Sequence, residues 1–329
     1  MILHGPENVA GMAGLLAKAQ RDLGLDSHAI CYPRNNLTFD ADFKFGAKSQ
    51  IDGKGFLETL WLEFSKADVL HFYFGGSFLG RGLQDALLAR FMGKKVFFTF
   101  LGCDIRDKQK RLASSNIEIC KECHPYACSA NRNSAMKIAN DGKAPVFVTT
   151  PDLIDELPNA KWLPLPFDGQ KIGFIKNHKR SDVFRIIHAP TDRSKKGTSH
   201  IIAAVADLQM SGLKIELKLC ESKTQNQVFE IAKECDLAID QIICGVYGTF
   251  GVEMMAHGLP TIAYIDERYR HRYPESLPII SANPDTIKDI IRKCYDEKIA
   301  LSAVSKQSRD FAFAFHNNIA VAKRIGSYY

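Results

Sequence analysis

The stretch from Cys235 to Ile265 constrains the fold of this chain more than any other part of the sequence. Residues 236–243 form an apolar run of the length of a buried strand, which Asp240 and Gln241 interrupt near its carboxyl end. A glycine-rich turn and a short helix follow, and a glycine and a proline mark the end of that helix. Residues 261–265 form a second β-rich run, so the stretch predicts a strand, a loop, a helix and a strand in succession.

The turn between the first strand and the helix has the composition of an anion site. Glycines at a helix N-terminus allow backbone N–H groups and the positive end of the helix dipole to approach a phosphate. Glu253 falls in the first turns of the predicted helix, where the dipole is expected to keep its carboxylate ionised and able to accept hydrogen bonds from sugar hydroxyls. Phosphates and hydroxyls occur together in a nucleotide sugar. The alternative is that Glu253 only caps the helix.

The segment GVYGTFGVEMMAHGLPTIAYI resembles the donor-site signature of GT-B glycosyltransferases of the retaining family 4 type. That signature reads E-G-F-G, then four residues, then E-A-M-A-x-G-x-P. Residues 245–248 fall on its first four positions, Glu253 on its second glutamate, and Gly258 and Pro260 on its closing glycine and proline. The resemblance implies that Glu253 holds the ribose of the donor. In the family the first glutamate contacts the donor sugar, and Gly245 stands in its place here.

A basic loop lies earlier in the same half of the chain, between a predicted strand and a predicted helix. It carries Arg193 and Lys196 in R-x-x-K-G spacing. Two cations beside a helix N-terminus form a phosphate site, and the resemblance implies that an Arg and a Lys in this loop grip the donor diphosphate. A solvated basic turn is the alternative. We expect the donor phosphates to bind these two cations and the backbone N–H groups of Gly248, Thr249 and Phe250.

The first half of the chain begins with a similar alternation of elements. Residues 2–4 predict a strand, residues 12–23 predict an amphipathic helix, and the loop between them contains Asn8 and Gly11. A glycine-bearing loop in this position opens a doubly wound nucleotide fold, so Asn8 and Gly11 are candidate donor contacts. An ordinary connection between strand and helix is the alternative, because short loops need Gly and Asn in any case.

A further candidate follows the strand predicted over residues 95–100. That strand runs into Leu-Gly-Cys-Asp104-Ile-Arg106, which resembles the H-G-S-D-x-R turn of related transferases. Asp104 would then lie at the carboxyl end of a strand, where open α/β sheets place ligands. Asp104 and Glu253 are therefore the candidate catalytic residues. A salt-bridged surface loop is the alternative for Asp104.

A cluster of thiols forms a candidate metal site. Cys120, Cys123 and Cys128, with His124 between them, have C-x2-C-H-x3-C spacing. Two cysteines two residues apart form a good zinc clamp, and a third thiolate nearby strengthens the case for structural zinc. The alternative is a reduced, partly buried group of cysteines in a loop.

The size and composition of the chain limit its organisation. Its 329 residues suit two domains of about 150 residues better than one core. No apolar run approaches the ~20 residues of a membrane span, and the first residues do not have the pattern of a secretory signal. Nine cysteines, an odd and scattered number, favour a reducing cytoplasm. The net charge of +6 comes without a basic stripe interleaved with aromatics, which disfavours nucleic acid as a partner.

The patterns and the resemblance together predict an α/β protein with the GT-B fold, in which two Rossmann-like domains face each other across a cleft. We expect residues 1–170 to bind the acceptor, residues 171–310 to bind the nucleotide sugar, and residues 311–329 to form a helix that returns to the first domain. The implied activity is a retaining, metal-independent transfer of a sugar from a nucleoside-diphosphate sugar, UDP- or GDP-linked, to a saccharide or a glycolipid. No cofactor is required for it.

Such an activity belongs to polysaccharide biosynthesis, and a lipid-linked acceptor would bring the protein into peripheral contact with a membrane. Two alternatives stay open. Because Gly245 replaces a glutamate, the chain could bind nucleotide sugars without efficient catalysis. It could also be a GT-B enzyme of another type, such as an epimerase.

Overall fold

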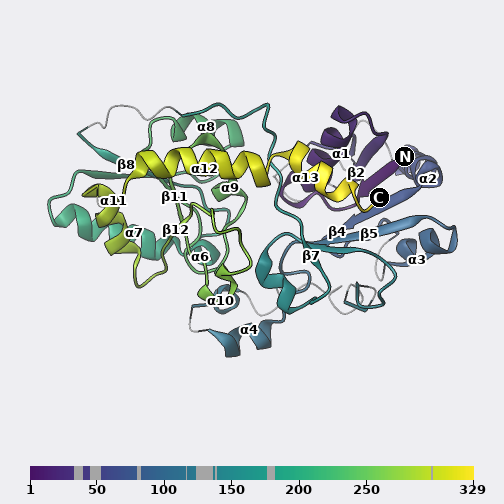
Figure 1. Ribbon diagram of the computed structural model, residues 1–329, viewed down its shortest axis with the longest axis horizontal. Coiled ribbons are helices and arrows are strands. Elements are labelled where there is room, and N and C mark those ends of the chain that lie inside the picture. The colour runs from purple at the N-terminus through teal and green to yellow at the C-terminus, as the bar shows by residue number, and fades with distance from the viewer. Residues whose placement is uncertain are drawn as a thin grey trace. The chain divides into compact units, whose positions relative to one another are not determined.

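The computed structural model describes residues 1–32, 40–44, 53–79, 83–115, 117–123, 136–137, 139–175, 182–297 and 299–329. The chain divides into two compact units, whose elements are labelled in Figure 1. The first unit comprises Met1–Asp107, Tyr126–Asp168 and Asn317–Tyr329. The second comprises Lys108–Pro125 and Gly169–His316. Each unit has its own parallel sheet, as the α/β prediction requires.

The sheet of the first unit has seven strands among the described residues, in the order β3-β2-β1-β4-β5-β6-β7. All neighbouring strands are parallel. The strands are β1 Ile2–Gly5, β2 Ser27–Cys31, β3 Phe43–Lys44, β4 Val69–Tyr73, β5 Lys95–Phe100, β6 Val146–Val148 and β7 Lys161–Trp162. The helices are α1 Met12–Asp22, α2 Gly53–Lys66, α3 Gln84–Phe91 and α13 Asn318–Gly326, with single turns at Val9–Gly11 and Pro151–Asp155.

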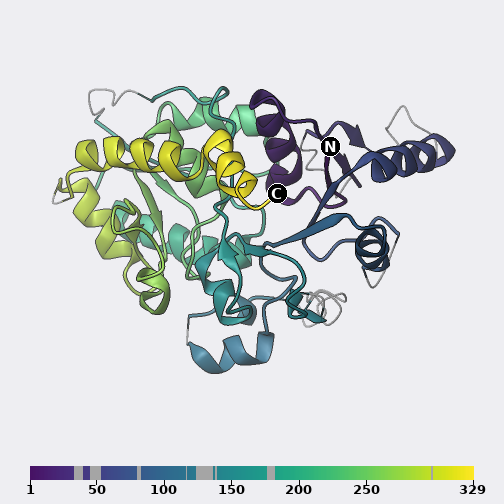
Figure 2. The same ribbon diagram turned by 45° about the vertical axis from the view of Figure 1, so that its right-hand side comes forward.

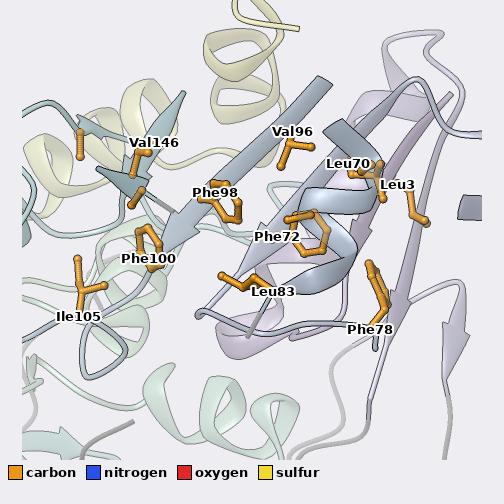
Figure 3. Close-up of a cluster of buried hydrophobic side chains, with 14 of the residues drawn as sticks. Leu3, Leu70, Phe72, Phe78, Leu83, Val96, Phe98, Phe100, Ile105 and Val146 are labelled. Atoms are coloured by element: carbon orange, nitrogen blue, oxygen red, sulfur yellow. The ribbon is translucent and has the colours of Figure 1, made fainter. Parts of the chain in front are cut away.

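Alternation along the strands divides the core of the first unit between the two faces of its sheet. On β4, Leu70 and Phe72 face the cluster that α2 and α3 cover, and Figure 3 shows both side chains there beside Phe98 of β5. Val69 and Tyr73 face the opposite cluster, which α1 and α13 cover. Helix α13 therefore belongs to the first unit although it ends the chain, and it lies beside α1 in both views (Figures 1 and 2). The last helix therefore returns to the first unit as predicted, but residues 311–316, which the prediction included, belong to the second unit.

The sheet of the second unit has five parallel strands among the described residues, in the order β12-β11-β10-β8-β9. The strands are β8 Phe184–His188, β9 Ile215–Leu219, β10 Leu237–Ile239, β11 Thr261–Ala263 and β12 Ile280–Ser281. The longer helices are α7 Thr198–Met210, α8 Gln225–Ala232, α9 Thr249–His257, α11 Ile287–Tyr295 and α12 Leu301–Phe315. The shorter ones are α4 Lys108–Ser114, α6 Arg193–Lys196, α10 Glu267–Arg270 and a turn at Ile119–Lys121.

Some elements differ from the sequence-based expectations for local reasons. Residues 161–168 pair with the sheet as a regular strand only at Lys161 and Trp162, and an isolated parallel bridge joins Phe167 to Asn317 further on. The regular strand stops early because Pro164 and Pro166 have no N–H to donate to a ladder. The charged stretch that follows residue 265 contains the short helix α10, whose first turn Asp266 caps by accepting from the N–H of Arg268.

The segment 108–125 groups with the second unit, whereas the sequence places it in the first domain. Two contacts explain this. Arg111 Nη1 donates to Tyr269 Oη of α10 at 2.9 Å. Cys120 is buried in a small apolar cluster with Cys244 and Val246.

A buried network of polar side chains joins strands β1 and β4 to helix α1 in the first unit. His4 Nδ1 lies 2.6 Å from Tyr73 Oη, and His4 Nε2 lies 2.7 Å from Gln20 Oε1. His71 contacts the hydroxyls of Tyr73 and Tyr329, both at 3.0 Å. Burial lowers the pKa of His4 to about 4 and lowers that of His71 well below its ordinary value. Both imidazoles are therefore neutral in the folded protein at pH 7.

None of the helices in the described part of the chain has both the length and the apolar character that crossing a membrane requires.

Candidate functional site

The predicted phosphate-binding side chains lie at the carboxyl ends of the strands in the second unit, where parallel sheets place ligands. The loop after β8 forms α6, a single helical turn that ends at Gly197, and α7 begins directly after it. Arg193 and Lys196 both belong to α6, but they have different partners. The two cations therefore have separate surroundings.

Lys196 is held at the end of β10. Its Nζ donates to Asp240 Oδ1 at 2.9 Å and to Gln241 Oε1 at 2.7 Å. The Asp240 side chain is 1% exposed and that of Lys196 is 15% exposed. The ammonium group is thus held by two hydrogen bonds, and the lysine side chain as a whole stays slightly exposed.

The N-terminus of α9 lies beside this ammonium group. The backbone N–H of Gly248 donates to Asp240 Oδ2 at 2.5 Å. A Cβ on Gly248 would lie 3.2 Å from Lys196 Nζ, so glycine permits this close approach. The N–H groups of Thr249 and Phe250 lie in the first turn of α9, where a helix offers no internal acceptor, and both residues are half-buried. These two N–H groups and the lysine form a cationic edge.

Arg193 is more exposed, with 58% of its side chain accessible, and it forms a two-pronged ion pair with Glu221 beyond the end of β9. It also lines a pocket of about 550 Å³ together with polar side chains of α6 and α7. Other residues around this pocket are Glu122, Ser194, Ser199, His200, Ile202, Ala203 and Ile243. The arginine, the serines and the histidine supply hydrogen-bond donors, whereas Glu122 adds a carboxylate and the remaining side chains are apolar.

Glu253 lies in the second turn of α9 and accepts a hydrogen bond from Gln225 Nε2 at the start of α8. The pKa of Glu253 is raised to about 7. Burial is the largest cause, the hydrogen bond from Gln225 lowers the pKa, and the negative charge of Asp240 raises it. The helix dipole therefore does not keep this carboxylate fully ionised: with a pKa of about 7 it is about half ionised at pH 7 in the unliganded protein. Burial outweighs the dipole, which acts mainly within the first turn.

Gly245, which stands where the resemblance places a glutamate, has a left-handed conformation with φ of +76°. A Cβ at this position would lie 3.1 Å from the Cβ of Asp266. Asp266 is itself paired with Arg268, which donates to both of its carboxylate oxygens. The absence of a side chain at position 245 is therefore built into the packing around it.

Asp104 holds the turn in which it stands. It is fully buried in the first unit, and its carboxylate accepts from the N–H groups of Leu101 at 3.0 Å and Gly102 at 2.6 Å. Burial raises the pKa of Asp104 to about 6. Arg106 forms a buried ion pair with Asp152 at 2.9 Å. A catalytic role for Asp104 stays a prediction.

Asn8 and Gly11 occupy the loop between β1 and α1. Asn8 Nδ2 donates to the backbone oxygen of Asp40 at 3.0 Å, and Asn8 Oδ1 accepts from the N–H of Gly14 at 3.2 Å. Gly11 caps α1 in a left-handed conformation, with φ of +72°. The side chain of Asn8 thus ties the start of α1 to a neighbouring loop, and donor contact by either residue stays a prediction.

The cysteine cluster is described only in part. Cys120 is buried and Cys123 is half-buried, while Cys128 and His124 lie outside the described residues. Within the described ranges no group of three or more His, Cys, Asp or Glu side chains is arranged to hold a metal ion. Structural zinc on the full set of cysteines stays a prediction.

Sequence reasoning did not assign four side chains that shape this site: Glu221, Gln225, Asp240 and Gln241. Asp240 and Gln241 had a detectable signal, because polar residues rarely interrupt a buried strand without a partner. Glu221 and Gln225 had none. Each lies in an ordinary polar stretch, and only the folded chain shows which residue it contacts.

Comparisons with known proteins connect this geometry to a fold. No family model matches the sequence, and no curated protein matches it. Solved structures do match. Sucrose-phosphate synthase from Thermosynechococcus elongatus matches with a TM-score of 0.66 and 13% identity, over 99% of this chain and 97% of that chain. Anabaena HepE in complex with UDP matches with a TM-score of 0.59 and 11% identity, over 99% and 98%.

A third match is a protein described as a UDP-N-acetylglucosamine 2-epimerase, from Listeria monocytogenes, with a TM-score of 0.55 and 12% identity over 99% of this chain and 94% of that chain. The chain has the GT-B fold. The three matches cover 99% of this chain and 94–98% of the solved chains, so the shared fold extends along nearly the whole sequence. Identities of 11–13% carry the fold and no further property.

Proposed function

We propose that this protein is a glycosyltransferase that moves a sugar from a nucleoside-diphosphate sugar, UDP- or GDP-linked, to a saccharide or glycolipid acceptor. In this proposal the second unit binds the donor and the first unit binds the acceptor. Transfer proceeds with retention of configuration and without a metal ion. The acceptor, where it is lipid-linked, brings the protein to the cytoplasmic surface of a membrane.

One observation carries the proposal: the ammonium group of Lys196 is fixed beside the free N–H groups at the start of α9. A cation and a helix N-terminus together form a site for a diphosphate. Arg193 adds a second positive charge on the same loop, and its exposed guanidinium can exchange Glu221 for a phosphate.

The proposed chemistry uses these charges on the leaving group. The bond between the anomeric carbon and the phosphate oxygen breaks, and the electron pair stays with the nucleoside diphosphate. A new bond forms between that carbon and an acceptor oxygen, whose proton passes to the phosphate oxygen of the departing nucleoside diphosphate. Donors aimed at the oxygen where charge develops stabilise the transition state most when they are already in place. Lys196 meets this condition because Asp240 and Gln241 already hold it.

The epimerase among the solved structures supports a second candidate, an isomerase acting on a sugar nucleotide. The two activities give different products. A transferase releases the nucleoside diphosphate, whereas an epimerase returns a sugar nucleotide of the same mass. A binding protein gives neither product, and the missing side chain at Gly245 keeps that alternative open.

The experiment starts from a panel of sugar nucleotides tested for stabilisation against urea. A ligand at 100 times its Kd adds about 2.7 kcal/mol to the free energy of unfolding. The ligand that stabilises is then incubated with the protein, with and without saccharide acceptors, and the nucleotides are separated by chromatography. Acceptor-dependent release of the nucleoside diphosphate supports the proposal. Stabilisation without any release, or conversion to an isomer of equal mass, would overturn it.

Replacing Glu253 by Gln is expected to weaken donor binding tenfold or more at about pH 8. Hydrogen bonds from ribose hydroxyls to an ionised carboxylate are worth about 1.5–3 kcal/mol, and about 1.4 kcal/mol is a factor of ten. Because the pKa of Glu253 is about 7, the wild-type carboxyl gains a proton as the pH falls. Wild type and variant are therefore expected to converge below pH 6. Calorimetry at both pH values measures this.

Glu230 supplies the matched control, because its carboxylate lies on α8 with 70% of its side chain exposed. Glu230→Gln should change donor affinity at neither pH. Equal affinities of wild type and Glu253→Gln at about pH 8 would mean that Glu253 only caps α9 and does not touch the donor.

A further inference from the structure

The ammonium group of Lys196 has three N–H donors, and two of them donate to acceptors among the described residues. One donates to Asp240 Oδ1 at 2.9 Å and one to Gln241 Oε1 at 2.7 Å. Both acceptors lie at the end of β10, behind the lysine as seen from the surface, since Asp240 is 1% exposed and Gln241 6%. An ammonium group has three N–H donors, so two bonds to these buried acceptors leave the third N–H available to a ligand.

The two acceptors are themselves fixed. Asp240 Oδ2 accepts from the N–H of Gly248, and a Cβ on Gly251 would lie 2.9 Å from the same oxygen. Gln241 Nε2 donates to the backbone oxygen of Val246 at 2.5 Å, which orients its amide so that Oε1 faces Lys196. Neither side chain can turn away without breaking a bond to the loop before α9 or to the helix itself.

The two hydrogen bonds that hold Lys196 lower the entropy that it loses when a ligand binds. A free lysine loses up to about 2 kcal/mol of rotamer entropy when it engages a ligand. Lys196 has already lost much of that freedom on folding, because its nitrogen is bonded at two points. The same bonds place it beside the N–H groups of Thr249 and Phe250, which are the other donors of the site.

We infer that Asp240 and Gln241 are positioning residues for diphosphate binding: they direct the third N–H of Lys196 at a phosphate oxygen of the donor. The inference rests on the proposed function and names two residues that act through the lysine. The side chain that accepts at position 241 is a neutral amide, and its lack of charge matters. One carboxylate balances the lysine, whereas a second one would hold the ammonium group inward and repel the phosphate.

The test compares a nucleoside diphosphate with its nucleoside, using UDP with uridine and GDP with guanosine. The preference for the diphosphate is the ratio of the two dissociation constants, measured by calorimetry on the full chain. Asp240→Asn and Gln241→Glu are each expected to lower this preference at least tenfold, or about 1.4 kcal/mol, and to leave nucleoside affinity unchanged. A residue with only a structural role would lower stability and leave the preference as it was.

Asp236 gives the matched control. It is half-buried just before β10, at the opposite end from Asp240, where its carboxylate accepts from the N–H of Arg185 at 2.7 Å. Asp236→Asn should cost stability without changing the preference.

Lys196→Met separates the possible failures. If it lowers the preference for the diphosphate and neither Asp240→Asn nor Gln241→Glu does, the positioning inference is overturned and the phosphate site stands. If the wild-type protein shows no preference for either diphosphate, the proposed function is overturned and the inference falls with it. Should Asp240→Asn fail to fold, Gln241→Glu decides alone, because it keeps the length of the side chain.

Discussion

Lys196→Met is expected to lower the free energy of unfolding of the second unit by about 3 kcal/mol, because it leaves the carboxylate of Asp240 buried without its cation. The Asp240 side chain is 1% exposed, so water cannot replace the lysine. Urea denaturation measures the loss. The double variant Lys196→Met, Asp240→Asn should recover part of it, since the amide carries no charge and still accepts from the N–H of Gly248.

The neighbouring lysine serves as the control for this result. Lys195 Nζ pairs with Asp192 at 2.9 Å, but both side chains are more than a third exposed. Exposed pairs contribute about 0.5 kcal/mol, so Lys195→Met should have little effect. Similar losses for the two variants would show that the pair of Lys196 and Asp240 is no more buried than a surface ion pair.

His4→Gln is expected to remove a large pH dependence from the stability of the first unit. The pKa of His4 is lowered by burial to about 4, against an ordinary value of 6.5. Between these two values the unfolded chain binds a proton that the folded protein cannot bind. The stabilisation is therefore complete above pH 6.5 and is lost as the pH falls toward 4, by about 3 kcal/mol in total.

The difference between wild type and His4→Gln isolates this contribution. Asp104, whose pKa is raised to about 6, changes stability in the opposite sense, and it cancels because it is present in both proteins. The difference in free energy of unfolding should shrink by about 3 kcal/mol between pH 7 and pH 4. His200→Gln, at an exposed position on α7, is the control. A difference that does not vary with pH would contradict the assignment of His4 as a buried neutral imidazole.

Much of the fold follows from local patterns. Short apolar runs predicted main strands of both sheets, and amphipathic segments predicted long helices. The sequence predicted that Arg193 and Lys196 lie on one loop, because the four residues from Arg193 to Lys196 form a single short segment. The exceptions depend on tertiary contacts. Helix α4 packs in the second unit because Arg111 meets Tyr269, which is 158 positions away in the chain.

The electrostatics of the site could not be predicted from the sequence for the same reason. Arg193 and Lys196 are two cations of one helical turn. Their carboxylate partners, Glu221 and Asp240, nevertheless follow different strands. Helix position alone suggested an ionised Glu253. Its raised pKa depends on burial and on the approach of Asp240, neither of which local sequence describes.

The central claim is that the loop after β8 in the second unit binds the phosphates of a nucleoside diphosphate. Calorimetric titration of UDP, GDP and the matching nucleosides into wild type and Arg193→Ala tests it most directly. Arg292→Ala is the control, since Arg292 on α11 is also an exposed arginine paired with a carboxylate. Arg193→Ala is expected to raise the Kd of the diphosphate about tenfold and to leave the Kd of the nucleoside unchanged. Equal losses for both ligands, or no loss for either, would contradict it.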